Sequence, residues 1–128
     1  MRLNSDIVPA LMACATGNLG EIDAQWTDKV ALNVVMAAKG YPGSYEKNTE
    51  IKNLVNAGAA DNVVIFHAGT KKESETVIAT GGRVLNITSL SSSVTEAKND
   101  AYKALDQIDW PEGFCRRDIG WRAVEREK

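Results

Sequence analysis

The 128-residue sequence has only two cysteines and one histidine, which limits the chemistry that it can perform. Cys14 and Cys115 do not form a CxxC motif and have no apparent metal-binding partner. A metal site needs more ligands than the chain offers around its histidine, so the sequence predicts no metal site. Because the first residues do not resemble a secretion signal, we expect reduced thiols and a cytoplasmic protein.

Long hydrophobic runs and a strong excess of either charge are also absent. The longest apolar stretch, Val30–Ala38, is interrupted by Asn33 and is much shorter than the roughly 20 residues of a membrane span. The formal net charge is −2, so no overall field attracts the chain to nucleic acid or to anionic lipid. The sequence therefore predicts neither a membrane nor a nucleic acid as a partner.

The familiar nucleotide-binding motifs are missing as well. The sequence has no P-loop and no GxGxxG after a predicted strand. No pair of acidic residues stands out as a magnesium site. We therefore expect that this chain alone binds neither ATP nor a metal ion.

The pattern of apolar residues predicts one α+β domain in which helices cover a small antiparallel sheet or a flattened barrel-sandwich hybrid. A first helix is expected after Asn4-Ser5-Asp6, with an apolar stripe that includes Ile7, Leu11 and Met12 and a stop at Gly17-Asn18. Ser93-Val94-Thr95-Glu96 fits a capping box that opens a second helix. That helix has the stripe Val94, Ala97, Ala101, Leu105 and Ile108. Strands are expected over residues 30–38, 49–51, 63–67, 76–80 and 83–89, followed by a strand or turn from Phe114 to Trp121.

Three segments place charged or hydrogen-bonding groups beside glycine, where backbone can approach a ligand closely. They are Phe66–Thr70, Gly81–Leu85 and Arg116–Ala123. Guanidinium groups match the oxygen atoms of phosphate and carboxylate, so the arginines in these segments indicate an anion-binding module. Residue chemistry alone indicates no reaction.

Arg83 follows Gly81-Gly82 at the start of a predicted strand, a position that could hold a phosphate. The alternative is a hairpin turn followed by a surface arginine, because double glycines are common in hairpins. The two-residue period of a strand predicts that Arg83, Leu85 and Ile87 share one face.

Arg116, Arg117 and Arg122 could form an anion clamp in which Asp118 orients one guanidinium group. In an extended segment Arg116 and Asp118 lie on one side and Arg117 on the other, so all three arginines cannot contact one ligand. The alternative is a set of exposed ion pairs with little energetic value.

His67 has no identifiable nucleophile or orienting carboxylate, so a structural histidine at the end of a strand is favoured over a general base. It could also orient the neighbouring loop. Gly40-Tyr41-Pro42-Gly43 is interpreted as a structural turn.

Four blocks in order resemble the C-terminal domain of the phosphoribosylamine–glycine ligase family, and the resemblance extends from about Arg2 to Ala123. They are Ala37–Gly43, Phe66–Thr70, Gly81–Leu85 and Arg116–Gly120. Asn48 and the pair Ser89-Leu90 depart from the family pattern at positions where small residues are usual. Leu3–Asp6 and Thr16–Leu19 resemble the end of the ATP-grasp region that precedes that domain in the family. The resemblance thus implies that residues 1–20 are the terminal helix of an ATP-grasp domain and residues 21–128 the C-terminal domain.

The family joins glycine to 5-phosphoribosylamine with ATP through glycyl phosphate, giving glycinamide ribonucleotide, ADP and phosphate in de novo purine synthesis. ATP and Mg²⁺ or Mn²⁺ bind upstream, so the resemblance implies no catalytic residue here and no activity without the upstream half. By analogy with related enzymes, Arg83 is the first candidate for the substrate phosphate and Arg116 and Arg117 are the second. Lys39, His67 and Arg122 are weaker candidates. The alternative function is a non-catalytic module that binds ribose phosphate or only packs on an ATP-grasp core.

Overall fold

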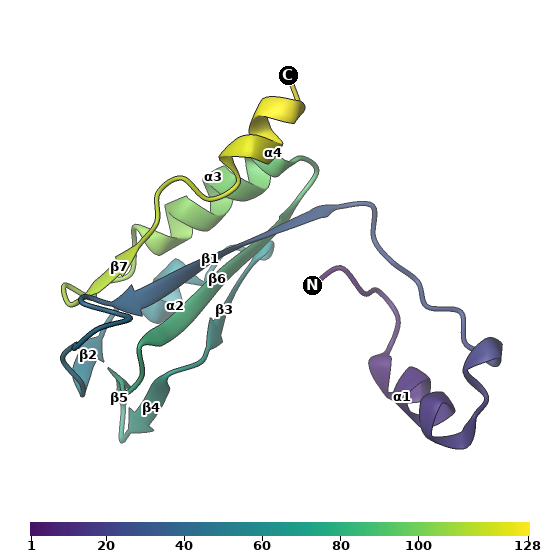
Figure 1. Cartoon of the computed structure of the whole chain (residues 1–128), viewed down its shortest axis with the longest axis horizontal. Helices are drawn as coiled ribbons and strands as arrows, with labels where there is room; N and C mark the ends of the chain where they lie inside the picture. The colour runs from purple at the N-terminus through teal and green to yellow at the C-terminus, as the bar shows by residue number, and fades with distance from the viewer.

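The computed structural model describes residues 1–128 and contains two antiparallel sheets, flanking helices and an N-terminal unit that stands apart from them (Figure 1). The larger sheet has four strands in the order β3-β6-β1-β7, and the smaller has three in the order β2-β5-β4. The α+β class predicted from the sequence is confirmed. The two sheets do not close into a barrel.

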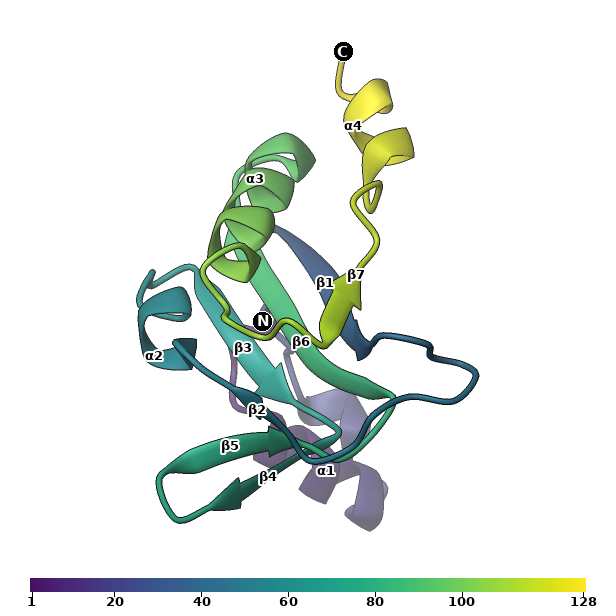
Figure 2. The ribbon, with the colours of Figure 1, turned by 90° about the vertical axis from the view of Figure 1, so that its left-hand side faces the viewer.

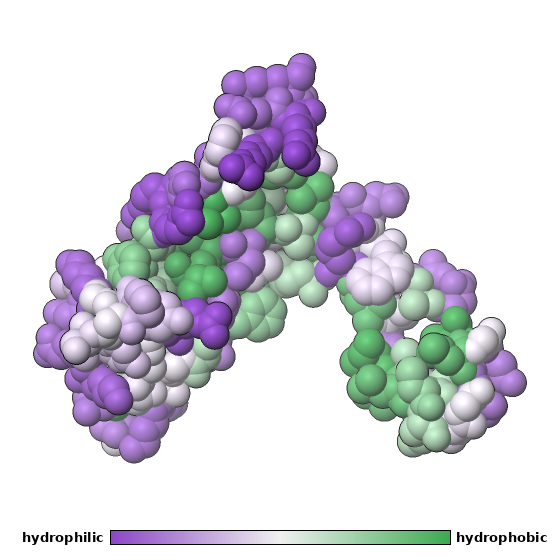
Figure 3. Space-filling view, viewed as in Figure 1, coloured by the Kyte–Doolittle hydropathy of each residue, from purple (hydrophilic) through white to green (hydrophobic).

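The N-terminal unit consists of α1 (Ile7–Thr16) and the short 3₁₀ helix η1 (Leu19–Glu21). The Asp6 side chain accepts a hydrogen bond from the Val8 N–H, and Gly17 ends α1 with a φ of 78°, as the sequence predicts. Only Ala13 of α1 is buried, and its large apolar side chains are exposed. Figure 3 shows hydrophobic residues gathered on this unit, away from the sheets. A bridge between Leu3 and Trp26 closes the unit.

The four-stranded sheet contains the strands predicted over residues 30–38, 63–67 and 83–89 and contributes 8 of the 17 residues of the core. Its strands are β3 (Val63–His67), β6 (Arg83–Ser91), β1 (Val30–Ala38) and β7 (Gly113–Cys115). All neighbouring strands are antiparallel. β1 lies between β6 and β7, so its side chains meet neighbours on both edges and much of the strand is buried.

The pairing of β1 with β6 contains one extra residue, Val84. Met36 lies opposite Leu85, but Ala37 lies opposite Arg83. Because of this one-residue step, Arg83 lies on the face opposite to that of Leu85. The expectation that Arg83 shares a face with Leu85 was therefore wrong, because strict two-residue alternation does not continue through the step. Val84 and Leu85 are both fully buried.

Helix α3 (Val94–Leu105) covers one face of the four-stranded sheet (Figure 2). The Ser93 hydroxyl accepts a hydrogen bond from the Glu96 N–H, which confirms the predicted N-cap. The Glu96 carboxylate bonds to Ser92 rather than to Ser93, so the capping box is incomplete. The predicted stripe is buried from Ala97 onward, although Ile108 lies beyond the end of the helix.

The three-stranded sheet lies at one end of the larger sheet and contains β2 (Thr49–Ile51), β5 (Thr76–Ala79) and β4 (Thr70–Glu73). The buried indole N–H of Trp110 donates to the Thr49 hydroxyl at 2.9 Å and thereby ties β2 to the segment after α3. Two short helices, α2 (Leu54–Ala57) and α4 (Trp121–Arg126), complete the chain. No helix has the length and apolar character needed to cross a membrane.

Candidate functional site

Two of the three segments singled out in the sequence meet at one corner of the molecule. The Gly69 N–H donates to the Arg83 carbonyl at 3.1 Å, and the Gly81 N–H donates to the Gly69 carbonyl at 3.1 Å. A Cβ atom on Gly69 would lie 2.8 Å from the Gly81 Cα. Bare backbone is thus required where these segments cross, and we name residues 67–70 and 80–83 the glycine–arginine corner.

Arg83 is the free cation of this corner. Its side chain is exposed and takes part in none of the five ion pairs of the chain. Lys39, directly after β1, is also exposed and unpaired, and its N–H donates to the Glu112 carbonyl at 2.8 Å. The structure therefore leaves the charges of Arg83 and Lys39 available to an anion.

His67 ends β3 beside the same corner. Its Nδ1 lies 3.0 Å from the Thr70 hydroxyl, and its ring is exposed. This contact links the end of β3 to the start of β4. The geometry agrees with a histidine that orients a loop, and no carboxylate contacts the ring.

The third segment follows β7, and its arginines lie away from the glycine–arginine corner. We name residues 116–119 the arginine loop. Arg116 forms two hydrogen bonds with Asp118, through Nε at 2.9 Å and Nη2 at 2.6 Å. These bonds raise the pKa of Arg116 and lower the pKa of Asp118. Arg117 instead donates to Asp106, the residue directly after α3, at 2.5 Å, and this bond raises the pKa of Arg117. The two arginines thus have separate partners. Because β7 ends at Cys115 and a turn follows, the strand alternation expected from the sequence does not apply to these residues.

Arg122 lies over the ring of its neighbour Trp121, with 5.1 Å between the guanidinium carbon and the ring centroid. Arg116 and Arg122 line a common hollow of about 490 Å³. Arg117 lines a different hollow beside β7. The candidate cations are therefore distributed over three places, and only Arg116 and Arg122 share a hollow.

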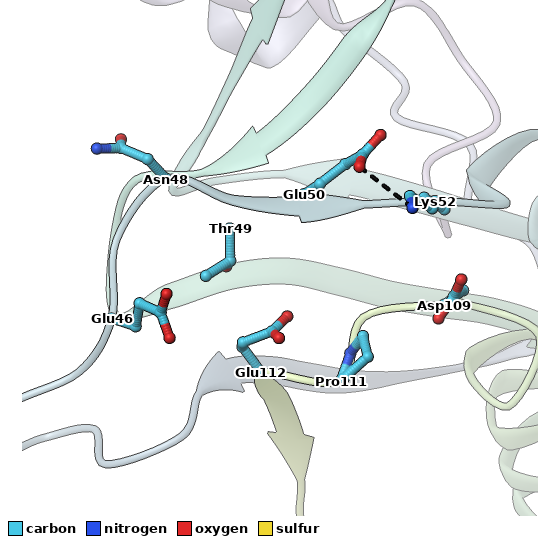
Figure 4. Close-up of a pocket in the computed structure, with 8 residues that line it drawn as sticks. All are labelled: Glu46, Asn48, Thr49, Glu50, Lys52, Asp109, Pro111 and Glu112. Atoms are coloured by element: carbon cyan, nitrogen blue, oxygen red, sulfur yellow. Dashed lines mark ion pairs between the residues drawn. The ribbon is translucent and has the colours of Figure 1, made fainter.

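Sequence reasoning missed an acidic hollow of about 360 Å³ between β2 and the segment before β7 (Figure 4). Its lining includes Glu46, Glu50, Asp109 and Glu112, and Glu50 forms an ion pair with Lys52 at 3.2 Å. The acidic residues come from two segments about 60 positions apart, so no local motif reveals them. Their carboxylates would repel a phosphate. No group of three or more side chains in the chain could hold a metal ion.

The two cysteines form no disulfide bond. Cys14 is exposed on α1 and Cys115 is half-buried in β7, and both are free. Burial raises the pKa of the Cys115 thiol, so it is less reactive than an ordinary thiol at neutral pH.

Comparison of the sequence with known families identifies the family to which the chain belongs. The family model described as phosphoribosylglycinamide synthetase, C domain, matches residues 31–122. The chain belongs to this family. The phosphoribosylamine–glycine ligase of Agrobacterium fabrum is 52% identical over 128 residues, which are all of this chain and 30% of that protein. The chloroplastic phosphoribosylamine–glycine ligase of Arabidopsis thaliana is 49% identical over 130 aligned positions, 24% of its length.

The fold of this family member also matches a solved structure. The crystal structure of phosphoribosylamine–glycine ligase from Thermotoga maritima aligns with a TM-score of 0.70 and 29% identity, over 88% of this chain and 27% of that one. The chain thus spans about 30% of the length of the curated relatives that it matches. The family resemblance found in the sequence is confirmed. The roles of individual arginines stay predictions.

Proposed function

We propose that this chain is the C-terminal part of a phosphoribosylamine–glycine ligase. The ligase would join glycine to 5-phosphoribosylamine with ATP, through glycyl phosphate, and release glycinamide ribonucleotide, ADP and phosphate. One observation supports this most strongly: the whole chain aligns at 52% identity with a protein of that name. A shared fold alone would not carry the proposal, because one fold hosts many functions.

ATP and Mg²⁺ or Mn²⁺ belong, in this proposal, to the preceding region of the ligase. The chain offers no cluster of three metal-ligating side chains, and its sequence has no phosphate-binding glycine loop. The carboxylates of the acidic hollow do not form such a cluster either. The residues present therefore do not fit a metal–nucleotide site, and in this proposal no chemical step of the reaction takes place on this chain.

The contribution that we assign to this chain is a seat for the substrate phosphate. Arg83 is the first candidate because its guanidinium group is exposed, unpaired and set beside bare backbone. Arg116 and Arg117 are the second candidates, and Lys39, His67 and Arg122 are the weaker ones. Binding at the arginine loop requires an exposed ion pair to open, which costs little because water screens both charges.

Residues 1–20 form, in the same proposal, the terminal helix of the ATP-grasp domain, and residues 21–128 the C-terminal domain. Ile7, Val8, Leu11 and Met12 on α1 are between 50% and 62% exposed, which suits a face covered by the upstream region. A cytoplasmic location also stays a prediction, and one relative is named chloroplastic.

A hybrid ligase tests the catalytic proposal. This chain would replace the corresponding 128 residues of the Agrobacterium ligase, whose upstream region supplies the rest. We expect ADP release that depends on both glycine and phosphoribosylamine from the hybrid and none from the chain alone. Turnover by the chain alone, or a folded but inactive hybrid, would contradict the proposal.

Calorimetry with glycinamide ribonucleotide tests the phosphate seat. We expect weak binding to the chain and its loss in Arg83→Ala, because that change removes the free guanidinium group. Arg126→Ala on α4 is the matched control and should bind like the wild type. Equal affinity in Arg83→Ala would move the seat to the arginine loop. No binding by the wild type would favour the alternative of a structural packing module.

A further inference from the structure

Tyr102 on α3 contacts the arginine loop at three points. Its hydroxyl donates to the Arg116 carbonyl at 2.6 Å and accepts from the Ile119 N–H at 3.2 Å. Its ring lies under the Arg117 guanidinium group, 5.5 Å from the ring centroid to the guanidinium carbon. One side chain thus holds both ends and one cation of the loop.

The other contacts of this loop are the core packing of its last residue and one exposed ion pair. β7 ends at Cys115, so residues 116–119 have no ladder hydrogen bonds to β1. The Arg116 and Asp118 side chains bond to each other, which does not attach the loop to the body of the molecule. Apart from Tyr102, two side chains attach the loop to the body of the molecule. Ile119 packs against the hydrophobic core, and Arg117 forms an exposed bond to Asp106.

We infer that Tyr102 is a positioning residue for the arginine loop, because it fixes the backbone from which Arg116 projects. The inference rests on the proposed function, since it assigns Tyr102 to substrate binding through the second candidates for the phosphate. The two hydrogen bonds use both the donor and the acceptor capacity of the hydroxyl, so phenylalanine cannot replace them. The ring stack on Arg117, by contrast, persists with phenylalanine.

The Tyr102 hydroxyl keeps its proton at neutral pH. Burial raises the pKa of Tyr102 above its ordinary value, and the hydroxyl therefore remains a donor at neutral pH. The titratable side chains that act on it are those of Cys115, Arg116, Arg117 and Asp118, and none of these side chains forms a hydrogen bond with the phenol oxygen.

Tyr102→Phe is the test, because it removes only the hydroxyl. Tyr45→Phe is the matched control: Tyr45 is also half-buried, but its hydroxyl makes no hydrogen bond in the protein. We expect faster amide exchange at Ile119 in Tyr102→Phe. Because the inference has Arg116 contact glycinamide ribonucleotide in addition to Arg83, we also expect about tenfold weaker binding. Tyr45→Phe should change neither quantity. Titrations are run at a temperature at which every variant is folded.

A double-mutant cycle separates positioning from general stability. If Tyr102 acts through Arg116, Tyr102→Phe should weaken binding little further in an Arg116→Ala background and by its full factor in a Lys39→Ala background. Equal factors in both backgrounds, or unchanged affinity in Tyr102→Phe, would overturn the inference and leave the proposed function intact. If the wild-type chain binds no glycinamide ribonucleotide, both the proposed phosphate site and this inference are wrong. The hybrid ligase tests the catalytic proposal independently of that result.

Discussion

Arg83 and Arg116 are both exposed, but their guanidinium groups have different surroundings. Arg83 has no acidic partner, whereas Asp118 binds Arg116 through two hydrogen bonds. An exposed pair of this kind stabilises the fold little, because water screens both charges. If Arg116 binds the proposed phosphate, the carboxylate of Asp118 would be displaced at small cost; without a ligand it orients the guanidinium group.

Glu127 gives a residue-scale prediction for the dependence of stability on pH. Its carboxylate accepts hydrogen bonds from the N–H groups of Val94 at 2.5 Å and Thr95 at 3.0 Å, at the start of α3. These bonds lower the pKa of Glu127, so its stabilising effect is present above the ordinary glutamate value of 4.5. That effect is lost as the pH falls through the lower folded pKa.

Thermal unfolding of the wild type and Glu127→Gln across this range checks the sign. We expect Glu127→Gln to have the lower Tm at neutral pH and the two Tm values to converge as the pH falls below 4.5. A difference in Tm that stays constant at all pH values would refute the capping role of the ionised carboxylate.

The sequence predicted one partner of the arginines and missed the others. Asp118 orients one guanidinium group as expected, that of Arg116. Tyr102 on α3 and Asp106 directly after it contact the loop and Arg117, and these contacts depend on how β7 returns to the sheet. Local patterns carry no information about that return.

At the scale of elements, most strands were predicted, including the three-residue β2, whereas the polar strand β4 and the short helices α2 and α4 were missed. β4 contains Lys71, Lys72 and Glu73 and lies at the edge of its sheet, so it has no apolar pattern. α2 has four residues and α4 has six, too few for a helical period to be recognised. The extra residue at Val84 was missed for a similar reason, since a bulge needs a partner strand to define it.

The crossing at Gly69 gives an element-scale prediction. In Gly69→Ala the new Cβ would lie 2.7 Å from the Arg83 carbonyl oxygen and 2.8 Å from the Gly81 Cα, and both are backbone atoms that cannot rotate away. We expect the free energy of unfolding in urea to fall by about 1–3 kcal/mol. Gly20→Ala is the control, because its Cβ meets no atom within 4 Å. Similar losses in both variants would show that the crossing is not the cause.

At the scale of the whole molecule, the N-terminal unit and the sheets do not share a core. The hydrophobic core cluster begins at Leu32 and ends at Trp110, and α1 contributes nothing to it. Figure 3 shows an open gap between the two parts. The exposed apolar side of α1 therefore adds nothing to the core of the sheets, which agrees with the proposed interface with an upstream region.

Removal of residues 1–28 tests this division. Because none of these residues belongs to the core cluster, we expect the shortened chain to keep the Tm of the sheets within about 2 °C. A large fall in Tm after removal would mean that the unit supports the sheets directly.

Leu11→Glu in the hybrid ligase tests the proposed contact of α1. It should lower activity, since α1 would then present a charge to the upstream region.

The three tryptophans are divided among the parts of the molecule described above. Trp26 belongs to the N-terminal unit and Trp121 to α4, and both are exposed, whereas Trp110 is only 4% exposed and joins the segment after α3 to β2. A water-soluble quencher should therefore extinguish the fluorescence of Trp26 and Trp121 and spare that of Trp110. The emission that remains, from Trp110, would report on the packing of the core. The quenchable emission, from Trp26 and Trp121, would report whether a binding partner covers either end of the chain.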